Sequence, residues 1–352
     1  TFSKVFESSD GYLWVGSNSG LFRFDGKRFK QISSLYYNSN SPSDNSIVDF
    51  EKDNLGNLWI AGFRYGITKY NLKTGQFRQY KRLSSDSTET YGTPCIYKDN
   101  QGTLWIGTAG RGLAKYLPQK DTFQLFYPDP LKATDGSKRA ENNVTGITED
   151  KNDKNILWLS CLDGLYSFNK TTNVFIYHPF IYPGDKIKNV NYFLCIEQLG
   201  NYLYLGTWYE GLVIFDKTTK QFKRIPYTNP GRDDYHYPIL DLQLLGDSII
   251  YMACINDGLL SYHIKTQTIS ATLTQPDVKQ LNTEISIQKL SLTQHAGFFA
   301  GGNAGIYQLH PNYNRFVNQI NYPADKIFAA EDTYLTATVY DANRKGYWAT
   351  FF

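Results

Sequence analysis

Several classes of protein are excluded by what this sequence lacks. The 352 residues contain one Met and no run that reaches the roughly 18 to 20 apolar residues of a membrane-spanning helix. We therefore expect no membrane contact by this chain. Basic and acidic residues nearly balance, with Lys+Arg 36 against Asp+Glu 33, and no basic stripe gathers them. Because nucleic-acid binding requires such a stripe, we expect no nucleic-acid partner.

The common metal and catalytic motifs are missing as well. The four cysteines lack the paired spacing of a zinc site, and burial as small apolar residues is the prediction for Cys95, Cys161, Cys195 and Cys254. No two of the five His have a metal-ligand spacing, and neither GxSxG nor GxxxxGK[ST] occurs. An acid pair such as Asp233-Asp234 is more simply an exposed loop. We predict no metal, no cofactor and no catalytic residue.

Aromatic residues, in contrast, are abundant. Tyr 28, Phe 22 and Trp 6 make up 16% of the chain, and 41% of all residues are hydrophobic. That is enough to form a large core. Aromatic and β-branched side chains suit pleated, half-buried strands, so the composition predicts an all-β protein.

A repeat runs through the whole chain. The unit reads apolar, aromatic, apolar, small, then Gly-apolar-x-x-aromatic, then a last aromatic, as in Leu58-Trp59-Ile60-Ala61, Gly66-Ile67-Thr68-Lys69-Tyr70 and Phe77. Its key aromatic occurs seven times, at Trp14, Trp59, Trp105, Trp158, Tyr204, Tyr251 and Phe299. The separations are 45, 46, 53, 46, 47 and 48 residues, and an eighth aromatic follows at Trp348.

This period predicts one architecture. Each unit holds four alternating segments of about five residues, bounded by Gly, Asn and Asp turns, which indicates four strands. One such sheet has two apolar faces, and radial stacking of seven sheets buries both. We predict a seven-bladed β-propeller of four-stranded antiparallel blades over residues 1–333. Residues 334–352 are predicted to be a partial eighth repeat that begins a second propeller.

The same geometry assigns a structural role to each recurrent residue. The key aromatic of the second strand is expected to fill the wedge between neighbouring sheets. The small residue two positions later is expected to let strands crowd near the axis. The Gly before the third strand is expected to adopt a positive φ in the loop.

The unit resembles the two-component regulator propeller repeat, whose usual form is D-x-x-G-x-L-W-I-G-T, then G-L-x-x-Y, then F. The resemblance rests on Gln101-Gly102-Thr103-Leu104-Trp105-Ile106-Gly107-Thr108 and on Leu55-Gly56-Asn57-Leu58-Trp59-Ile60, and it extends along nearly the whole chain. The fifth to seventh copies depart from it by carrying Tyr or Phe in place of Trp.

The resemblance implies a location and a function. Such repeats form the periplasmic sensor of hybrid two-component systems, notably in gut Bacteroidetes, where two propellers precede a β-sandwich, a membrane helix and a histidine kinase. The ligand is typically an oligosaccharide released from a polysaccharide. We therefore expect this chain to be the N-terminal part of such a sensor, with the second propeller and downstream sensor domains as intrachain partners. The resemblance leaves a homodimer of the full-length protein open.

The candidate binding residues are those that break the repeat on one face. In a propeller the loops between second and third strands share a face with the linkers between blades. Sugars stack on aromatic rings and bond to polar side chains, and Arg pairs with a uronate or sulfate group. The predicted oligosaccharide site on this rim comprises Arg64, Tyr65, Arg111, Asp163, Trp208, Tyr209, Glu210 and Asn256, with His236 from a blade linker.

Three functions remain open from the residues alone. The first is the non-catalytic sensor, the second a carbohydrate-active lyase or hydrolase, and the third a scaffold whose faces contact only protein. For Trp208 and Tyr209 the alternative to binding is packing on the blade linker or against the second propeller, since exposed apolar groups mark either kind of interface.

Overall fold

The computed structural model describes most of the chain. The described residues are 2–8, 10–25, 28–34, 38–83, 91–128, 142–180, 192–227, 238–273, 285–293, 297–303 and 305–310, and the strands within 315–320, 335–341 and 346–351. All the regular structure in these ranges is β-strand or turn, and the all-β prediction is confirmed.

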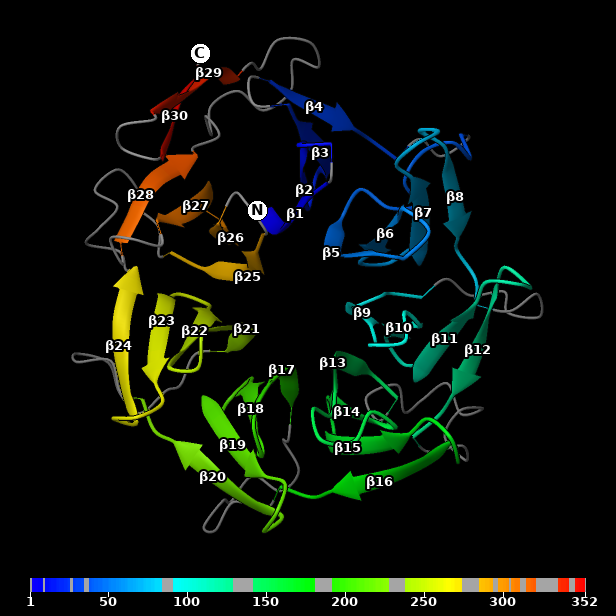
Figure 1. The fold of residues 1–352 in the computed structure, drawn as a ribbon, viewed down its shortest axis with the longest axis vertical. Helices are drawn as coiled ribbons and strands as arrows, with labels where there is room; N and C mark the ends of the chain where they lie inside the picture. Colours follow the sequence, from blue (N-terminus) through cyan, green and yellow to red (C-terminus); the bar gives the residue numbers. More distant parts are fainter. Residues whose placement is uncertain are drawn as a thin grey trace.

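Seven sheets of four antiparallel strands surround a central channel, so the predicted seven-bladed propeller is confirmed (Figure 1). Blades 1 to 3 are β1 (Phe2–Glu7), β2 (Leu13–Ser17), β3 (Gly20–Phe24), β4 (Phe29–Ile32); β5 (Ile47–Lys52), β6 (Asn57–Gly62), β7 (Ile67–Asn71), β8 (Phe77–Tyr80); and β9 (Cys95–Lys98), β10 (Leu104–Gly107), β11 (Leu113–Leu117), β12 (Thr122–Phe126). Blades 4 and 5 are β13 (Val144–Glu149), β14 (Ile156–Cys161), β15 (Gly164–Asn169), β16 (Val174–His178); and β17 (Phe193–Leu199), β18 (Tyr202–Thr207), β19 (Leu212–Asp216), β20 (Gln221–Ile225). Blades 6 and 7 are β21 (Ile239–Leu245), β22 (Ile249–Cys254), β23 (Gly258–His263), β24 (Thr268–Leu273); and β25 (Ile287–Leu292), β26 (Phe298–Gly302), β27 (Gly305–His310), β28 (Arg315–Ile320).

Each blade is built from four consecutive strands, with the first strand lining the channel and the fourth at the outer edge (Figure 1). The ring closes where β1 packs against β25 and β26. Two further strands, β29 (Leu335–Asp341) and β30 (Gly346–Phe351), pair with each other in a separate two-stranded sheet, with Val339 opposite Trp348. That this segment begins a second propeller stays a prediction.

The key aromatics fill the spaces between blades, as the repeat predicts. Trp59 is fully buried and contacts Tyr116 of the next blade, with ring centroids 4.5 Å apart. Trp105 packs on Phe168 of the next blade in the same way, with ring centroids 5.7 Å apart. Blades 1 to 5 each place the second-strand aromatic against a third-strand aromatic of the next blade, which helps to bury both faces of the sheets.

The small and Gly positions of the repeat are required by close approaches. A Cβ at Gly107 would lie 2.4 Å from the carbonyl oxygen of Val144 in the next blade, so strands near the axis touch backbone to backbone. All seven glycines before the third strands have a positive φ. At Gly66 the φ is 78°, and a Cβ would lie 2.2 Å from the Tyr80 carbonyl oxygen, which excludes any larger residue.

The aspartate of the repeat binds the tryptophan. Asp53 caps its own turn by accepting bonds from the amides of Leu55 and Asn57, and its second carboxylate oxygen accepts the Trp59 Nε1 proton at 2.8 Å. The same indole–carboxylate bond joins Trp105 to Asp99 at 2.9 Å. A buried indole N–H needs an acceptor, and the preceding turn provides it.

The first strands are joined around the channel by a ring of small polar side chains. At each of the seven blade junctions, a side chain from one first strand bonds to the backbone of the adjacent first strand. The bonds are Ser3 to Ile47, Asp49 to Ile96, Cys95 to Val144, Thr145 to Phe193, Cys195 to Ile239, Asp241 to Leu290 and Ser291 to Val5. Two of the four cysteines therefore serve as weak donors in this ring. All four are buried, as predicted.

Candidate functional site

The loops between second and third strands lie beside the blade linkers, so the predicted rim is one continuous face. Phe63 N–H donates to the Ser46 carbonyl at 2.8 Å, Ala109 N–H to Gly92 at 3.0 Å, and Trp208 N–H to Tyr192 at 2.9 Å. In each case a loop residue bonds to the linker that enters the same blade. The backbone of this face is therefore fixed by hydrogen bonds, and its side chains project from a rigid support.

Trp208 and Tyr209 form an exposed aromatic pair on blade 5. Their side chains are 37% and 41% exposed, and their rings meet nearly edge to face with centroids 6.4 Å apart. Tyr192 of the linker lies 6.1 Å from Tyr209, ring to ring. Since the rings pack on one another and still face solvent, this cluster can stack against a ligand.

Arg64 and Tyr65 form a second exposed group on blade 2. The buried carboxylate of Asp44 accepts the Arg64 amide at 2.7 Å and the Tyr65 amide at 3.1 Å, which fixes the loop. The Arg64 guanidinium lies 5.9 Å from the Phe63 ring centroid. Phe63 is exposed as well and was not among the predicted residues, although its place in the same loop was a signal that it belongs to this group.

Two predicted polar residues, Asp163 and Glu210, bond within their own blades. Asp163 accepts the Tyr166 hydroxyl at 2.6 Å. Glu210 pairs with Arg224 of the same blade, Oε2 to Nε at 3.1 Å. These contacts fix the two side chains within their blades, so neither carboxylate is freely available to a ligand.

Asn256 and Arg111 complete the described part of the predicted site. Asn256 has φ 65°, its amide donates to Ser286 Oγ, and its side-chain oxygen accepts the Ser286 hydroxyl at 3.2 Å. Arg111 is half-buried, and its amide donates to Thr108 Oγ1 at 3.1 Å. His236 lies outside the described residues.

The predicted residues therefore occupy one face but form separate groups. Blades 2 and 5 lie on opposite sides of the channel (Figure 1), so Arg64 and Tyr65 are across from Trp208 and Tyr209, with Arg111 and Asp163 on the blades between them. The structure describes no contact between the two aromatic groups. A ligand touching both would span the channel mouth.

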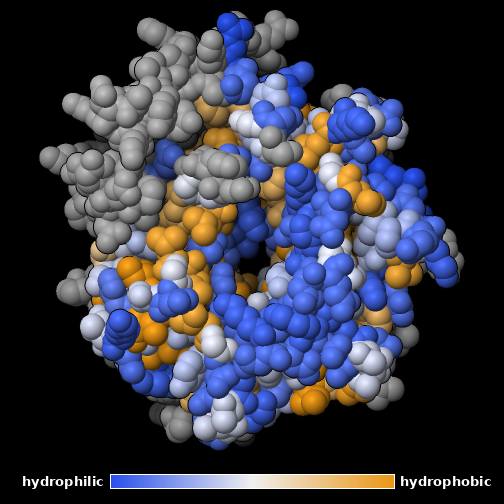
Figure 2. Space-filling model, in the orientation of Figure 1, coloured by the Kyte–Doolittle hydropathy of each residue, from blue (hydrophilic) through white to orange (hydrophobic). Residues whose placement is uncertain are grey.

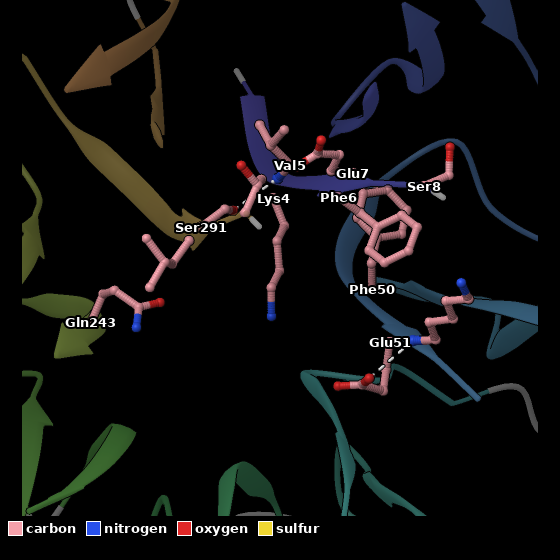
Figure 3. Close-up of a pocket in the computed structure, with 12 residues that line it drawn as sticks. Lys4, Val5, Phe6, Glu7, Ser8, Phe50, Glu51, Gln243 and Ser291 are labelled. Atoms are coloured by element: carbon pink, nitrogen blue, oxygen red, sulfur yellow. Dashed lines mark hydrogen bonds between the residues drawn. The ribbon is translucent and has the colours of Figure 1, made fainter. Parts of the chain in front are cut away.

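The channel contains a cavity of about 450 Å³ that sequence reasoning did not find. Lys4, Glu51 and Gln243 point into it from three first strands (Figure 3). Ser8, Lys52 and Thr293 also line it, and they lie at the ends of first strands, next to the first hairpins. The cavity is therefore at the end of the channel away from the predicted rim. Figure 2 shows the central opening.

Charges line this channel in pairs. Lys4 Nζ lies 2.5 Å from Asp49, and Lys289 Nζ lies 3.6 Å from Asp241. Burial alone would lower the pKa of Lys4, but the carboxylates of Asp49 and Asp241 raise it above the ordinary value. Burial raises the pKa of Glu197 to about 7, and the Asp241 charge adds to the effect. The wall therefore holds a carboxyl group that titrates near neutral pH.

Two further observations on the described residues concern metal ligands and membrane-spanning helices. No group of three or more His, Cys, Asp or Glu within them is arranged to hold a metal ion. Within the same residues, no helix has the length and apolar character to cross a membrane.

Comparison with known proteins bears on the repeat. Residues 89–110 match the model of the family described as the two component regulator propeller. This stretch contains Trp105 and the Asp99 that bonds to its indole. At residues 89–110 the repeat unit is that of the two-component regulator propeller. The resemblance predicted from the residues is confirmed at this unit. The sequence matches no curated protein.

Solved structures with this fold include two extracellular domains of putative hybrid two component systems. One is the extracellular domain of a putative hybrid two component system from B. thetaiotaomicron, with TM-score 0.66 and 20% identity over 87% of this chain and 37% of that chain. A second extracellular domain of such a system, from the same organism, has TM-score 0.64 and 16% identity over 100% of this chain and 50% of that chain. The chain thus spans half or less of these structures, and at such identities the likeness shows the fold.

Proposed function

We propose that this chain is a non-catalytic, ligand-sensing propeller of a two-component system. The observation that carries the proposal is the two-component regulator propeller repeat at residues 89–110, on a fold similar to the extracellular domains of putative hybrid two component systems. On this proposal the chain lies in the periplasm and belongs to an inner-membrane sensor. The histidine kinase that receives the signal is elsewhere in the full-length protein.

We propose further that the ligand is an oligosaccharide bound on the rim. Trp208 and Tyr209 supply exposed rings for the C–H faces of a sugar, and Arg64 and Arg111 supply charged donors for hydroxyl, uronate or sulfate groups. The second propeller of the same chain is the proposed partner that completes the site, since sites at domain junctions need both halves.

Titration calorimetry of the whole sensor region against a panel of neutral and acidic oligosaccharides tests this proposal. We expect one member to bind, and Arg111→Ala to weaken an acidic ligand more than a neutral one. The same mixtures, followed by chromatography, are expected to contain intact oligosaccharide, because the proposal assigns no catalysis. Cleavage products would instead favour a lyase or hydrolase, and a panel without any binder would leave a protein scaffold.

A further inference from the structure

The channel cavity holds charged side chains that closure of the propeller does not require. Lys4 and Glu51, which point into it, are 31% and 29% exposed, so both charges are largely removed from water (Figure 3). Taking a charge out of water costs free energy unless a partner compensates it. Neither side chain belongs to the ring of bonds that joins the first strands around the channel. Their presence therefore calls for another role.

Lys4 and Glu51 both keep bonding capacity toward the cavity. Lys4 Nζ has three protons and lies 2.5 Å from one carboxylate oxygen of Asp49, which accepts one of them. Glu51 Oε1 accepts the Lys52 amide at 3.0 Å and lies 3.7 Å from Lys98 Nζ. The second oxygen, Oε2, bonds to no residue in the described part of the chain. One charged donor and one charged acceptor are therefore open to a ligand.

Gln243 adds a neutral acceptor from a third strand. Its Nε2 donates to the Leu244 carbonyl at 3.2 Å, and its Oε1 has no bonding partner among the described residues. Burial raises the pKa of Glu51, and the Lys4 charge opposes that rise, so these two charges interact. Lys4, Glu51 and Gln243 come from β1, β5 and β21 and line one cavity of about 450 Å³ (Figure 3). A single small molecule can therefore contact all three.

The charges that line the cavity are balanced. Lys4 and Lys52 are positive, and Glu7 and Glu51 are negative. A ligand with a net charge of either sign would upset this balance, whereas a ligand with one group of each sign keeps it. Charge-assisted hydrogen bonds are about twice as strong as neutral ones, so such a ligand also bonds more strongly than a neutral polyol does. The lining therefore favours a zwitterion.

Part of the cavity lining is apolar. Phe6 contributes to it, and Leu292, the last residue of β25, is 53% exposed there. We propose that the cavity binds an α-amino acid with an apolar side chain. The ammonium group of the ligand donates to Glu51 Oε2 and Gln243 Oε1, and its carboxylate accepts from Lys4 Nζ. Its side chain packs on Phe6 and Leu292, in a cavity whose volume is in the range of small-molecule sites.

Titration calorimetry of the 352-residue chain with four compounds tests the proposal. L-Leucine carries both charges, isoamylamine lacks the carboxylate, isocaproate lacks the ammonium group, and glycerol has hydroxyl groups alone. We expect L-leucine to bind, and each of the other three to bind at least about tenfold more weakly. A wild type that does not bind L-leucine would overturn the proposal. So would equal or tighter binding of any compound that lacks one of the two charges.

Two variants assign the binding to this cavity. Glu51→Gln removes the charged acceptor and Gln243→Leu the neutral one, and each is expected to raise the dissociation constant of L-leucine by about tenfold or more. Asp247→Asn, on the exposed hairpin between β21 and β22, is the matched control and should bind as wild type does. Circular dichroism melts verify that each protein is folded. Affinity that is unchanged in both cavity variants, or that Asp247→Asn weakens to the same extent, would overturn the assignment.

The cavity site is independent of sugar binding, because it lies at the end of the channel away from the rim. Trp208→Ala should therefore leave the affinity for L-leucine unchanged. Failure of the oligosaccharide titrations does not affect this proposal, and failure of the L-leucine titration does not affect the proposed sensor function.

Discussion

Ser291 Oγ accepts the backbone N–H of Val5 at 2.9 Å and so joins residues 286 positions apart in the chain (Figure 3). No strand of blade 7 completes blade 1, so the junction between them depends on packing and on side-chain bonds such as this one. The bond is the last member of the ring that links all seven first strands. A strand shared between blades 1 and 7 would join them by backbone hydrogen bonds. The single Ser291 hydroxyl provides part of that connection.

Removing this hydroxyl should destabilise the propeller. Ser291→Ala leaves a buried amide without its acceptor, and we expect a loss of about 1 to 2 kcal/mol in the free energy of unfolding. Ser270→Ala, at an exposed position of β24, is the matched control and should change stability by less than about 0.5 kcal/mol. Urea unfolding followed by circular dichroism measures both. Equal midpoints for the two variants would show that the Ser291 bond contributes nothing to closure.

The key tryptophans and Trp208 should respond differently to truncation. Trp59 and Trp105 are almost fully buried between blades, so changing either to Ala should cost about 3 to 5 kcal/mol. Trp208 is partly exposed and outside the core clusters, so Trp208→Ala should cost under about 1.5 kcal/mol. Equal drops in urea midpoint for all three would identify Trp208 as another core residue.

Blade 1 contains a correctable defect. Trp14 Nε1 is buried and has no hydrogen-bond partner among the described residues, because Ser8 occupies the position that Asp53 and Asp99 hold in the next two blades. Ser8→Asp combined with Asp10→Asn, which removes a neighbouring like charge, should supply the acceptor and stabilise the fold by about 1 kcal/mol.

The control for this design is the same pair of substitutions in a Trp14→Phe background, where no indole N–H exists. Thermal unfolding of the four proteins forms a double-mutant cycle. A gain of equal size in both backgrounds would contradict the assigned bond.

Glu197 should make stability depend on pH. Its pKa in the folded protein is raised to about 7, above the ordinary value, so its contribution to stability is fully present below the unfolded pKa and is lost as pH rises through 7. Glu197→Gln removes the buried charge. The free energy of unfolding of the variant should equal that of wild type near pH 4.5 and exceed it by about 1 to 3 kcal/mol at pH 8. Urea unfolding at both pH values measures this, and a difference independent of pH would refute the assignment.

The fold was predictable because its core positions repeat in chemistry as well as in spacing. An aromatic residue, such as Trp59 or Trp105, occupies the same place in every copy of the unit. The glycines before the third strands recur with it. The ring around the channel was not predictable, since Ser3, Asp49, Cys95 and Thr145 perform one task with four different side chains. Any small group that can donate or accept one hydrogen bond suffices there, so no pattern of residue type emerges.

The candidate site was predictable only in part. Breaks in the repeat identified the loop that carries Trp208 and the loop that carries Arg64. The internal partners of Glu210 and Asn256 could not be foreseen, because Arg224 and Ser286 lie on a different strand or linker and meet them only in the folded blade. The channel cavity is lined by residues of four first strands, β1, β5, β21 and β25, that are far apart in the sequence, so it has no local signal.

We propose that the rim of the second–third strand loops binds the oligosaccharide. The most direct test is titration of the whole sensor region with its cognate oligosaccharide, comparing wild type, Trp208→Ala and Tyr202→Ala. Tyr202 is the control because it is 47% exposed on β18, the strand that leads into the Trp208 loop, but at the end away from the rim. We expect Trp208→Ala to lose about 2 kcal/mol or more of binding free energy and Tyr202→Ala to bind as wild type does. Unchanged affinity in a folded Trp208→Ala protein would contradict the claim and leave this rim as a packing surface.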